Sequence, residues 1–237
     1  TLSSSSAASD VYKRQVVTGG ASGIGQECAR QLREDGWRVA VWDRAGNGDD
    51  PAVDVADYAS VAAAARRLDG VDLLVNAAGI AGGREPVAEK DPAEWAQVLA
   101  VNLTGTMRTC AAARPLLAQH GGVIVNTASM LSFFGGALVP AYSASKGGVA
   151  QLTKSLALAY AAENIRVNAV APGWIATPLT QALQDDPARS GPILQRTALG
   201  RWGLPADVAR AAVFLCSPAA GFITGHILPV DGGYLAA

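Results

Sequence analysis

Short apolar runs alternate with longer helical stretches from Val16 to the end of the chain. The apolar runs cover residues 16–18, 38–42, 71–75, 123–126, 165–170 and 226–230. The helical stretches cover residues 25–35, 58–68, 92–119, 142–163 and 205–216. Apolar runs this short and continuous are typical of strands buried on both faces of a parallel sheet. The strict alternation predicts one α/β domain over residues 16–237, built as a doubly wound, Rossmann-like parallel sheet.

The first fifteen residues do not continue this pattern. Residues 1–9 are rich in Ser and Ala and lack the apolar stretch of a signal peptide. Residues 10–15, DVYKRQ, resemble the in-frame translation of a transposase adaptor used in shotgun sequencing. We therefore expect residues 1–15 to be a non-native or disordered segment, the alternative being a genuine polar arm.

Composition narrows the class of protein. Half of the residues are hydrophobic and the formal net charge is −1, so there is no electrostatic reason to expect nucleic acid or an anionic membrane as partner. No apolar run approaches the ~18 residues of a membrane span. Cys28, Cys110 and Cys216 form no CxxC pair, which indicates buried thiols in a reducing cytoplasm. His120 and His226 stand alone, so we expect no metal site.

A glycine-rich turn, TGGASGIG, follows the first predicted strand and leads directly into a helix. Glycines let the backbone approach a pyrophosphate, and the helix N-terminus offers free N–H groups and a positive dipole end to the anion. An ordinary strand–helix loop could look similar, but the position after the first strand favours a dinucleotide site. Its candidate residues are Gly19, Ser22, Gly23, Ile24 and Gly25.

Asp43 ends the second predicted strand, where a dinucleotide fold places an acidic residue on the adenosine ribose. A carboxylate there accepts hydrogen bonds from the ribose hydroxyls and repels a 2′-phosphate, which predicts NAD rather than NADP as the cofactor. Arg44 complicates this prediction because an arginine can accommodate that phosphate; we interpret it as a solvated charge. Asp54 and Val55 follow a later strand-like position, although Asp54 could instead cap a turn or a helix.

Tyr142 and Lys146 open a strongly helical stretch and lie four residues apart, hence on one helix face. A free tyrosine has a pKa of about 10 and is a poor base near neutrality. A neighbouring cation lowers the pKa of the phenol, which predicts an acid/base role for Tyr142. By itself the pair could equally be an ordinary tyrosine beside an exposed lysine.

Two further polar residues strengthen this interpretation. Ser129 follows the strand-like run 123–126, near the sheet edge that carries the nucleotide loops, and its hydroxyl could bond the substrate oxygen. Asn102 lies among apolar neighbours in the long stretch 92–119, where we expect it to hold a water that links Lys146 to solvent as a proton path.

The glycine-rich turn, Asn76-Ala77-Ala78-Gly79, Asn102, Ser129, the pair Tyr142 and Lys146, and Pro172-Gly173 follow one another along the chain. Together they resemble the short-chain dehydrogenase/reductase family in its single-domain form. The resemblance covers Val16 to the end of the chain, and six separate elements occur in the family's order and spacing. It implies a catalytic tetrad of Asn102, Ser129, Tyr142 and Lys146, with Lys146 also holding the nicotinamide ribose. It implies that the cofactor also meets Asp54, Val55, Asn76, Ala77, Ala78, Gly79, Pro172, Gly173, Ile175 and Thr177. Family members are usually tetramers, and runs of alanine at 111–113 and 157–162 would permit close helix packing between subunits.

The sequence departs from the family pattern in two places within this region. Residue 77 is alanine where many members have a second asparagine. Asp43 and Asp54 are too close together for the helix usually found between them, so we expect a loop to cross there and leave the adenine edge open.

Residues 128–142 and 200–205 resemble sugar-acid dehydrogenases of the family, such as those acting on 2-dehydro-3-deoxygluconate or gluconate. The expected lid, residues 174–196, carries Arg189 and Arg196, which could bind a substrate carboxylate or simply be solvated. Phe133, Phe134 and Trp174 could line an apolar pocket or pack the lid.

The sequence therefore predicts an oxidoreductase that transfers a hydride between NAD(H) and a small secondary alcohol or ketone. One alternative is a reductase of hydrophobic ketones or β-ketoacyl groups, the latter usually NADP-dependent. A second is a nucleotide-binding sensor without catalysis, which would need the glycines but not Tyr142 with Lys146. A serine hydrolase is excluded because the chain has no Gly-x-Ser-x-Gly elbow.

Overall fold

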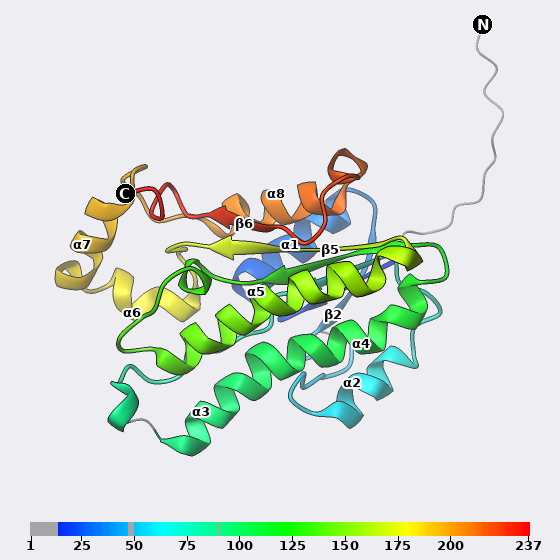
Figure 1. The fold of residues 1–237 in the computed structure, drawn as a ribbon, viewed down its shortest axis with the longest axis horizontal. Helices are drawn as coiled ribbons and strands as arrows, with labels where there is room; N and C mark the ends of the chain where they lie inside the picture. Colours follow the sequence, from blue (N-terminus) through cyan, green and yellow to red (C-terminus); the bar gives the residue numbers. More distant parts are fainter. Residues whose placement is uncertain (1–13, 47–49, 90) are drawn as a thin grey trace, which may run out of the picture.

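A six-stranded parallel sheet forms the centre of the protein, with strand order β2-β1-β3-β4-β5-β6 (Figure 1). The computed structural model describes residues 14–46, 50–89 and 91–237. The strands are β1 (Arg14–Thr18), β2 (Arg38–Trp42), β3 (Leu73–Asn76), β4 (Gly122–Thr127), β5 (Ile165–Pro172) and β6 (Ile227–Val230). The predicted single-domain α/β fold is confirmed. Of the expected non-native segment, residues 1–13 lie outside the described residues, whereas Arg14 and Gln15 belong to β1.

Helices cover both faces of the sheet, as the continuous apolar strands require. On one face α1 (Gly23–Glu34) and α8 (Pro205–Cys216) pack over a core that includes Val17, Val75 and Val125. On the other face α2 (Tyr58–Ala65), α4 (Thr106–Leu117) and the C-terminal half of α5 (Pro140–Tyr160) cover Val16, Leu74 and Ile124. The alternation of these valines, leucine and isoleucine along the strands follows the period-2 geometry of β structure.

The predicted long helix over residues 92–119 is divided into three parts. It begins as α3 (Pro92–Leu99), passes through one π-helical segment, η2 (Ala100–Gly105), and continues as α4. π-helical turns inside α-helices are rare and are often found at functional sites. Here the altered turn contains Asn102, whose backbone carbonyl accepts a hydrogen bond from Thr106 Oγ1 at 2.8 Å.

No helix among the described residues separates β2 from the loop that carries Asp54, as the short spacing predicted. The chain instead makes an isolated parallel bridge between Asp43 and Ala52. The loop then rests on the junction of η2 and α4, where a Cβ at Gly105 would lie 2.8 Å from the side chain of Val55. Arg108 of α4 donates a hydrogen bond to the carbonyl of Ala56.

The lid contains helices that the sequence pattern did not predict. The turn η5 (Pro178–Thr180) leads into α6 (Gln181–Gln184) and α7 (Pro187–Arg196), and both helices lie beyond the carboxyl ends of the strands (Figure 1). Asp186 caps α7 by accepting a hydrogen bond from Ala188 N–H. Four other short 3-10 turns are η1 (Val87–Glu89), η3 (Met130–Ser132), η4 (Ala161–Glu163) and η6 (Pro218–Ala220).

Gln15 is an anomaly in the strand core. It is only 2% exposed, and neither its Oε1 nor its Nε2 has a hydrogen-bond partner. The next two residues of β1, Val16 and Val17, are fully buried apolar side chains. An amide at this position loses its hydration without compensation.

No helix in the described part of the chain is long and apolar enough to cross a membrane.

Candidate active site

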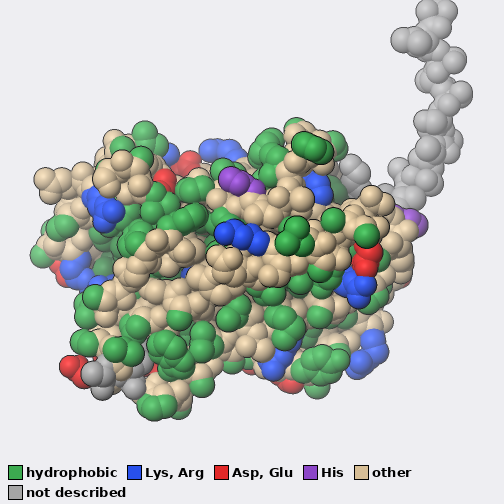
Figure 2. Space-filling view, viewed as in Figure 1, with side chains coloured by type: hydrophobic (Ala, Val, Ile, Leu, Met, Phe, Trp, Pro, Cys, Tyr) green, Lys and Arg blue, Asp and Glu red, His purple; other side chains and the backbone are tan. Residues whose placement is uncertain are grey.

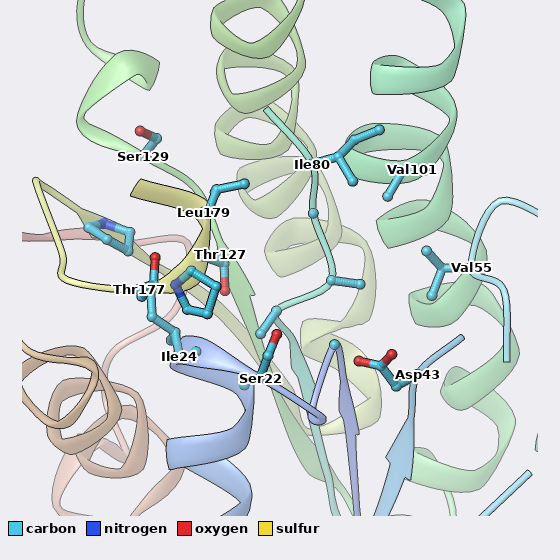
Figure 3. Close-up of a pocket in the computed structure, with 18 of the residues that line it drawn as sticks. Ser22, Ile24, Asp43, Val55, Ile80, Val101, Thr127, Ser129, Thr177 and Leu179 are labelled. Carbon is cyan, nitrogen blue, oxygen red and sulfur yellow. The ribbon is translucent and has the colours of Figure 1, made fainter. Parts of the chain in front are cut away.

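A cleft of about 320 Å³ runs along the carboxyl edge of the sheet. In Figure 3, Asp43 and Val55 lie at one end of it and Ser129 at the other, with Ser22, Ile24 and Thr177 between them. The structure brings most of the predicted site residues to this cleft: Gly19, Ser22, Gly23, Ile24, Gly25, Asp43, Asp54, Val55, Ala77, Ala78, Gly79, Ser129, Tyr142, Lys146, Pro172, Gly173, Ile175 and Thr177. Asn76 and Asn102 are not among its lining residues.

The glycine-rich turn fits an anionic ligand. Gly19 has a positive φ of 65°, and a Cβ there would lie 2.7 Å from the backbone of Ala78. Ser22 lies at the N-cap of α1, yet its side chain makes no capping hydrogen bond, and the first turn of α1 contains no acidic residue. The free hydroxyl, the free N–H groups and the helix dipole would all stabilise a pyrophosphate.

Asp43 lies at the end of the cleft where the adenosine ribose is expected. Its Oδ2 accepts a hydrogen bond from Ala21 N–H at 3.2 Å, and its Oδ1 accepts one from Ala45 N–H at 3.1 Å. These bonds hold a carboxylate beside the cleft and leave each oxygen a further lone pair for a ribose hydroxyl. Arg44 also lines the cleft but is exposed, in agreement with its interpretation as a solvated charge.

For Asp54 the sequence left open a turn residue or a residue of the cofactor site, and the structure places it both in a turn and at the cleft. Its Oδ1 accepts a hydrogen bond from Ala56 N–H at 2.8 Å, which is the geometry of a turn residue. It also lines the cleft next to Val55. The side chain thus shapes the loop that brings Val55 to the adenine end.

Asn76 has a structural role in the described chain. Its Nδ2 donates to Asn126 Oδ1 at 2.9 Å, and its Oδ1 accepts from Thr109 Oγ1 at 2.7 Å. This buried network joins β3, β4 and α4. Thr18, which sequence reasoning did not select, accepts hydrogen bonds from Ala77 N–H at 3.1 Å and Ala78 N–H at 3.2 Å. Together these bonds hold the loop after β3 against the glycine-rich turn.

Tyr142 and Lys146 do share one helix face, and the Lys146 ammonium lies 5.6 Å from the centre of the Tyr142 ring. Lys146 is 4% exposed, and its Nζ donates to the carbonyl of Thr127 at 2.6 Å. Burial lowers the pKa of Lys146 to about 8.

The expectation that Lys146 lowers the pKa of Tyr142 is wrong for the chain by itself. Burial raises the pKa of the Tyr142 phenol above its ordinary value, and a hydrogen bond with Ser129 opposes this rise only in part. The ammonium is directed to the Thr127 carbonyl, and burial of the phenol penalises the phenolate.

Ser129 is 6% exposed and follows β4 at the catalytic end of the cleft. Its Oγ accepts a hydrogen bond from Leu131 N–H at 3.2 Å, and the Ser129 side chain is near enough to the Tyr142 phenol to act on its pKa. The two hydroxyls therefore face a common point, at which a substrate oxygen could receive bonds from both.

Asn102 is fully buried and lies behind the catalytic residues. Its Oδ1 accepts from Ile80 N–H at 2.9 Å, and its Nδ2 donates to Ile80 O at 2.9 Å and to Ser145 Oγ at 3.0 Å. A Cβ at Gly79 would lie 3.4 Å from Asn102 Oδ1 and 3.6 Å from Lys146 Nζ. The side chain ties the loop after β3 to α5, and its expected water-holding role stays a prediction.

An aromatic cluster lies at the lid. Trp174 makes edge-to-face contacts with Trp202 and Tyr234, and Tyr234 stacks with Phe134. The Arg196 guanidinium lies 4.3 Å from the centre of the Tyr234 ring, so it anchors α7 to the C-terminal segment. Phe134 and Trp174 thus pack the lid, whereas Phe133 is 52% exposed.

Sequence reasoning missed several residues near the substrate end. Ile80, Val101, Thr127, Leu179 and Thr180 also line the cleft. Their positions follow from loops and from the π-helical turn, for which the sequence carries no distinct signal.

Among the described residues no group of His, Cys, Asp or Glu side chains is arranged to hold a metal ion.

Comparison with known proteins agrees with this geometry. The sequence model of the enoyl-(acyl carrier protein) reductase family matches residues 19–235. The chain is 44% identical to a cis-4-hydroxycyclohexanecarboxylate dehydrogenase from Sinomonas cyclohexanicum over 241 positions, covering 93% of this chain and 96% of the relative. It is 39% identical to the 2-dehydro-3-deoxy-D-gluconate 5-dehydrogenase of Escherichia coli over 247 positions, covering 94% and 96% of the two chains.

A solved structure is similar over nearly the whole chain. It is a protein of Agrobacterium tumefaciens assigned as a 2-deoxy-D-gluconate 3-dehydrogenase, with bound NADP. Its TM-score to this chain is 0.89 at 41% identity, and the match covers 95% of this chain and 97% of the other.

Proposed function

The chain belongs to the short-chain dehydrogenase/reductase family, and on this basis we propose that it transfers a hydride between NAD(H) and a secondary alcohol or ketone of a sugar acid or polyol. The observation that carries the proposal is the convergence of Ser129, Tyr142 and Lys146 at one end of a cleft that fits a dinucleotide. A nucleotide sensor would need the glycine-rich turn but would not need a buried lysine beside a buried phenol. The oxidoreductase therefore explains more of the site than the sensor does.

In the proposed mechanism, a bound nicotinamide dinucleotide supplies or accepts the hydride. Tyr142 gives its phenolic proton to the carbonyl oxygen during reduction and takes it from the alcohol during oxidation. Ser129 hydrogen-bonds the same oxygen. Lys146 would hold the nicotinamide ribose, and Asn102, through its bonds to Ile80 and Ser145, keeps α5 and the loop at Gly79 in register. Pro172, Gly173, Ile175 and Thr177 would border the nicotinamide.

The protonation state of Tyr142 makes the rates of reduction and oxidation depend differently on pH. Because burial raises the pKa of its phenol, Tyr142 is protonated and ready to act as an acid. Carbonyl reduction needs that acid, whereas alcohol oxidation needs the phenolate. We therefore propose that reduction proceeds near neutrality and that oxidation accelerates as the pH rises.

NAD is the cofactor we propose, with NADP as the alternative. Asp43 supports NAD because its carboxylate lies beside the cleft and would repel a 2′-phosphate. The Agrobacterium protein with bound NADP supports the alternative, as does Arg44, an exposed cation one residue farther along. The fixed position of the carboxylate decides our preference.

We propose that the substrate carries a carboxylate. The named relatives act on a hydroxycyclohexanecarboxylate and on a deoxy sugar acid, which share a carboxylate and a secondary alcohol. Arg189 of the lid helix α7 supports such a substrate because its guanidinium could bind a carboxylate.

The test is a substrate panel assayed with NAD(H) and with NADP(H). It contains gluconate, 2-dehydro-3-deoxygluconate, 4-hydroxycyclohexanecarboxylate, galactitol and an aryl ketone. We expect the carboxylates to have the highest kcat/KM, with NAD(H) preferred. Asp43→Ser should shift the preference toward NADP(H) by about tenfold, roughly the value of one charged hydrogen bond. Absence of turnover with every substrate would contradict the proposed function, and a native preference for NADP(H) would contradict the role of Asp43.

We also propose a homotetramer located in the cytoplasm. Leu158 of α5 is 83% exposed and Met107 of α4 is 43% exposed, and apolar side chains are spread over this face of the molecule (Figure 2). A second contact would involve β6 and the C-terminal segment. Three buried, unpaired cysteines favour a reducing compartment.

A further inference from the structure

Ser132 lies three residues after Ser129, and its hydroxyl makes two hydrogen bonds, one as acceptor and one as donor. Ser132 Oγ accepts a hydrogen bond from Ser129 N–H at 3.2 Å and donates one to the carbonyl of Lys146 at 2.7 Å. A single hydroxyl therefore joins the backbone of one residue of the proposed active site to the backbone of another.

The two bonds connect separate elements. Ser129 lies at the N-cap of the 3-10 turn η3, whose own hydrogen bonds, such as Ser132 N–H to Ser129 O at 2.9 Å, close the turn on itself. Lys146 lies in α5, one helical turn after Tyr142. The Ser132 hydroxyl is thus a direct bond between the turn that holds Ser129 and the helix that carries Tyr142 and Lys146.

This geometry has a consequence for the acid/base pair. The side chains of Ser129 and Tyr142 can share a substrate oxygen only if their two elements keep a fixed separation. Displacements of a fraction of an ångström are sufficient to weaken such hydrogen bonds and the chemistry that depends on them. The Lys146 ammonium also ties α5 to the carbonyl of Thr127, two residues before Ser129. The Ser132 bridge differs from that bond because it holds the Ser129 turn itself, which otherwise closes on itself.

We propose that Ser132 is a positioning residue, whose hydroxyl locks the Ser129 turn to α5 and thereby sets the separation of Ser129 Oγ from the Tyr142 phenol. The proposal rests on the proposed function for its catalytic meaning. Ser132 does not contact the substrate and acts through Ser129.

The neighbouring Ser143 provides a matched control. It also bridges two backbone groups, since its Oγ accepts from Gly136 N–H at 3.0 Å and donates to Val139 O at 3.0 Å. It fixes the loop before α5 and makes no bond to Ser129 or Lys146. Removal of its hydroxyl costs a similar pair of hydrogen bonds without disturbing the bridge.

The kinetic test is a double-mutant cycle. We expect Ser132→Ala to lower kcat by about tenfold, the effect of a misplaced hydrogen bond, with an unchanged KM for NAD(H). Ser132→Thr, which keeps the hydroxyl, should restore most of the activity. Ser129→Ala should lower kcat further, and adding Ser132→Ala to it should change little, because Ser132 acts through Ser129. Ser143→Ala and Ser129→Ala should be additive.

A second readout does not need turnover. The ionisation of Tyr142 can be followed by near-ultraviolet absorbance, with Tyr142→Phe as the blank. Loss of the Ser129 hydrogen bond should raise the pKa of Tyr142 in Ser132→Ala but not in Ser143→Ala. If no substrate is turned over, the proposed function fails while this titration still tests the positioning.

Three results would overturn the proposal. They are additivity of Ser132→Ala with Ser129→Ala, an unchanged titration of Tyr142 in Ser132→Ala, and equal losses of activity in Ser132→Ala and Ser132→Thr. If Ser132→Ala does not fold, the test rests on Ser132→Thr. A kcat of this variant below about half of the wild-type value would then contradict the positioning role, because the variant keeps the hydroxyl and should lose at most one weak contact.

Discussion

At Tyr142 two effects of the surrounding protein oppose each other. The sequence places a lysine one helical turn away, and a cation favours the phenolate. The fold then buries both groups, which penalises each charged form and raises the pKa of Tyr142 while lowering that of Lys146. The spacing of the two residues could be predicted from the helix period, but the outcome could not, because burial depends on the packing of α5 and the β4 loop.

The pH dependence follows from these two shifts. The oxidation rate should rise with pH through neutrality because the phenolate fraction of Tyr142 grows, and the slope should decrease near pH 8, where Lys146 is half deprotonated. The reduction rate should be nearly constant from about pH 6 to about pH 7, because Tyr142 stays protonated and Lys146 stays charged there. Initial rates in both directions over this range test the prediction. An oxidation rate that is independent of pH would contradict it, once a chemical step is shown to be rate-limiting.

Gln15 makes a prediction about stability. Replacing this buried amide, which has no hydrogen-bond partner, by leucine should stabilise the fold by about 1–3 kcal/mol, the cost of an unsatisfied buried polar group. For a domain of this size that corresponds to a rise in Tm of several degrees, about 2–4 °C per kcal/mol. Thermal unfolding measures the change, with Gln151→Leu on the exposed side of α5 as the control. A Tm that does not rise would show that the site is hydrated.

Among the elements, the strands and long helices were predictable and the irregular segments were not. The bounds of β2 and α8 agree with the apolar periodicity residue for residue. The π-helical turn at Ala100–Gly105 escaped prediction, since its sequence AVNLTG continues the helical pattern and only packing against Ile80 and Ser145 explains its altered geometry. The lid helix α6 has only four residues and α7 contains Pro187 and Pro192, so periodicity carried little signal there.

The missing helix between Asp43 and Asp54 gives α4 a role at the cofactor end. Arg108 supports the loop by its hydrogen bond to Ala56 O, next to Val55 in the cleft. Arg108→Met should therefore raise the KM for NAD by about fivefold, the value of one hydrogen bond of about 1 kcal/mol, and leave kcat at saturating NAD unchanged.

Arg114→Met is the control for this variant, because Arg114 lies on the same helix but pairs with Glu163 at the surface. Steady-state kinetics with NAD as the varied substrate distinguishes the two. If both variants have the wild-type KM, α4 does not hold the adenine loop.

For the whole molecule, the site could be predicted because parallel strands end at one edge. Thr18, Asn76 and Asn126 are aligned in register across β1, β3 and β4, so the loops that follow these strands meet. Motif order along the chain was therefore sufficient to collect eighteen of the predicted residues at one cleft. The roles of Asn76 and Asn102 could not be predicted in the same way, since each lies behind the cleft in a hydrogen-bond network that only the three-dimensional structure reveals.

The proposed assembly can be tested through Leu158. A charge at this exposed position of α5 should disrupt a contact that buries it, because an unpaired arginine is costly in an interface. We expect wild-type protein to be a tetramer and Leu158→Arg to be a dimer by light scattering. Tyr58→Arg, at another strongly exposed position on α2, should remain a tetramer. A monomeric wild-type protein would contradict the proposed assembly.

The central claim is that Tyr142 transfers the proton that accompanies hydride transfer in this cleft. Its most direct test is single-turnover hydride transfer by Tyr142→Phe, with NADH binding measured by fluorescence on the same sample. The account predicts that NADH binds within about twofold of wild type, while hydride transfer falls by at least ~100-fold, the lower range for loss of a general acid. Hydride transfer close to the wild-type rate, with NADH binding intact, would contradict the account.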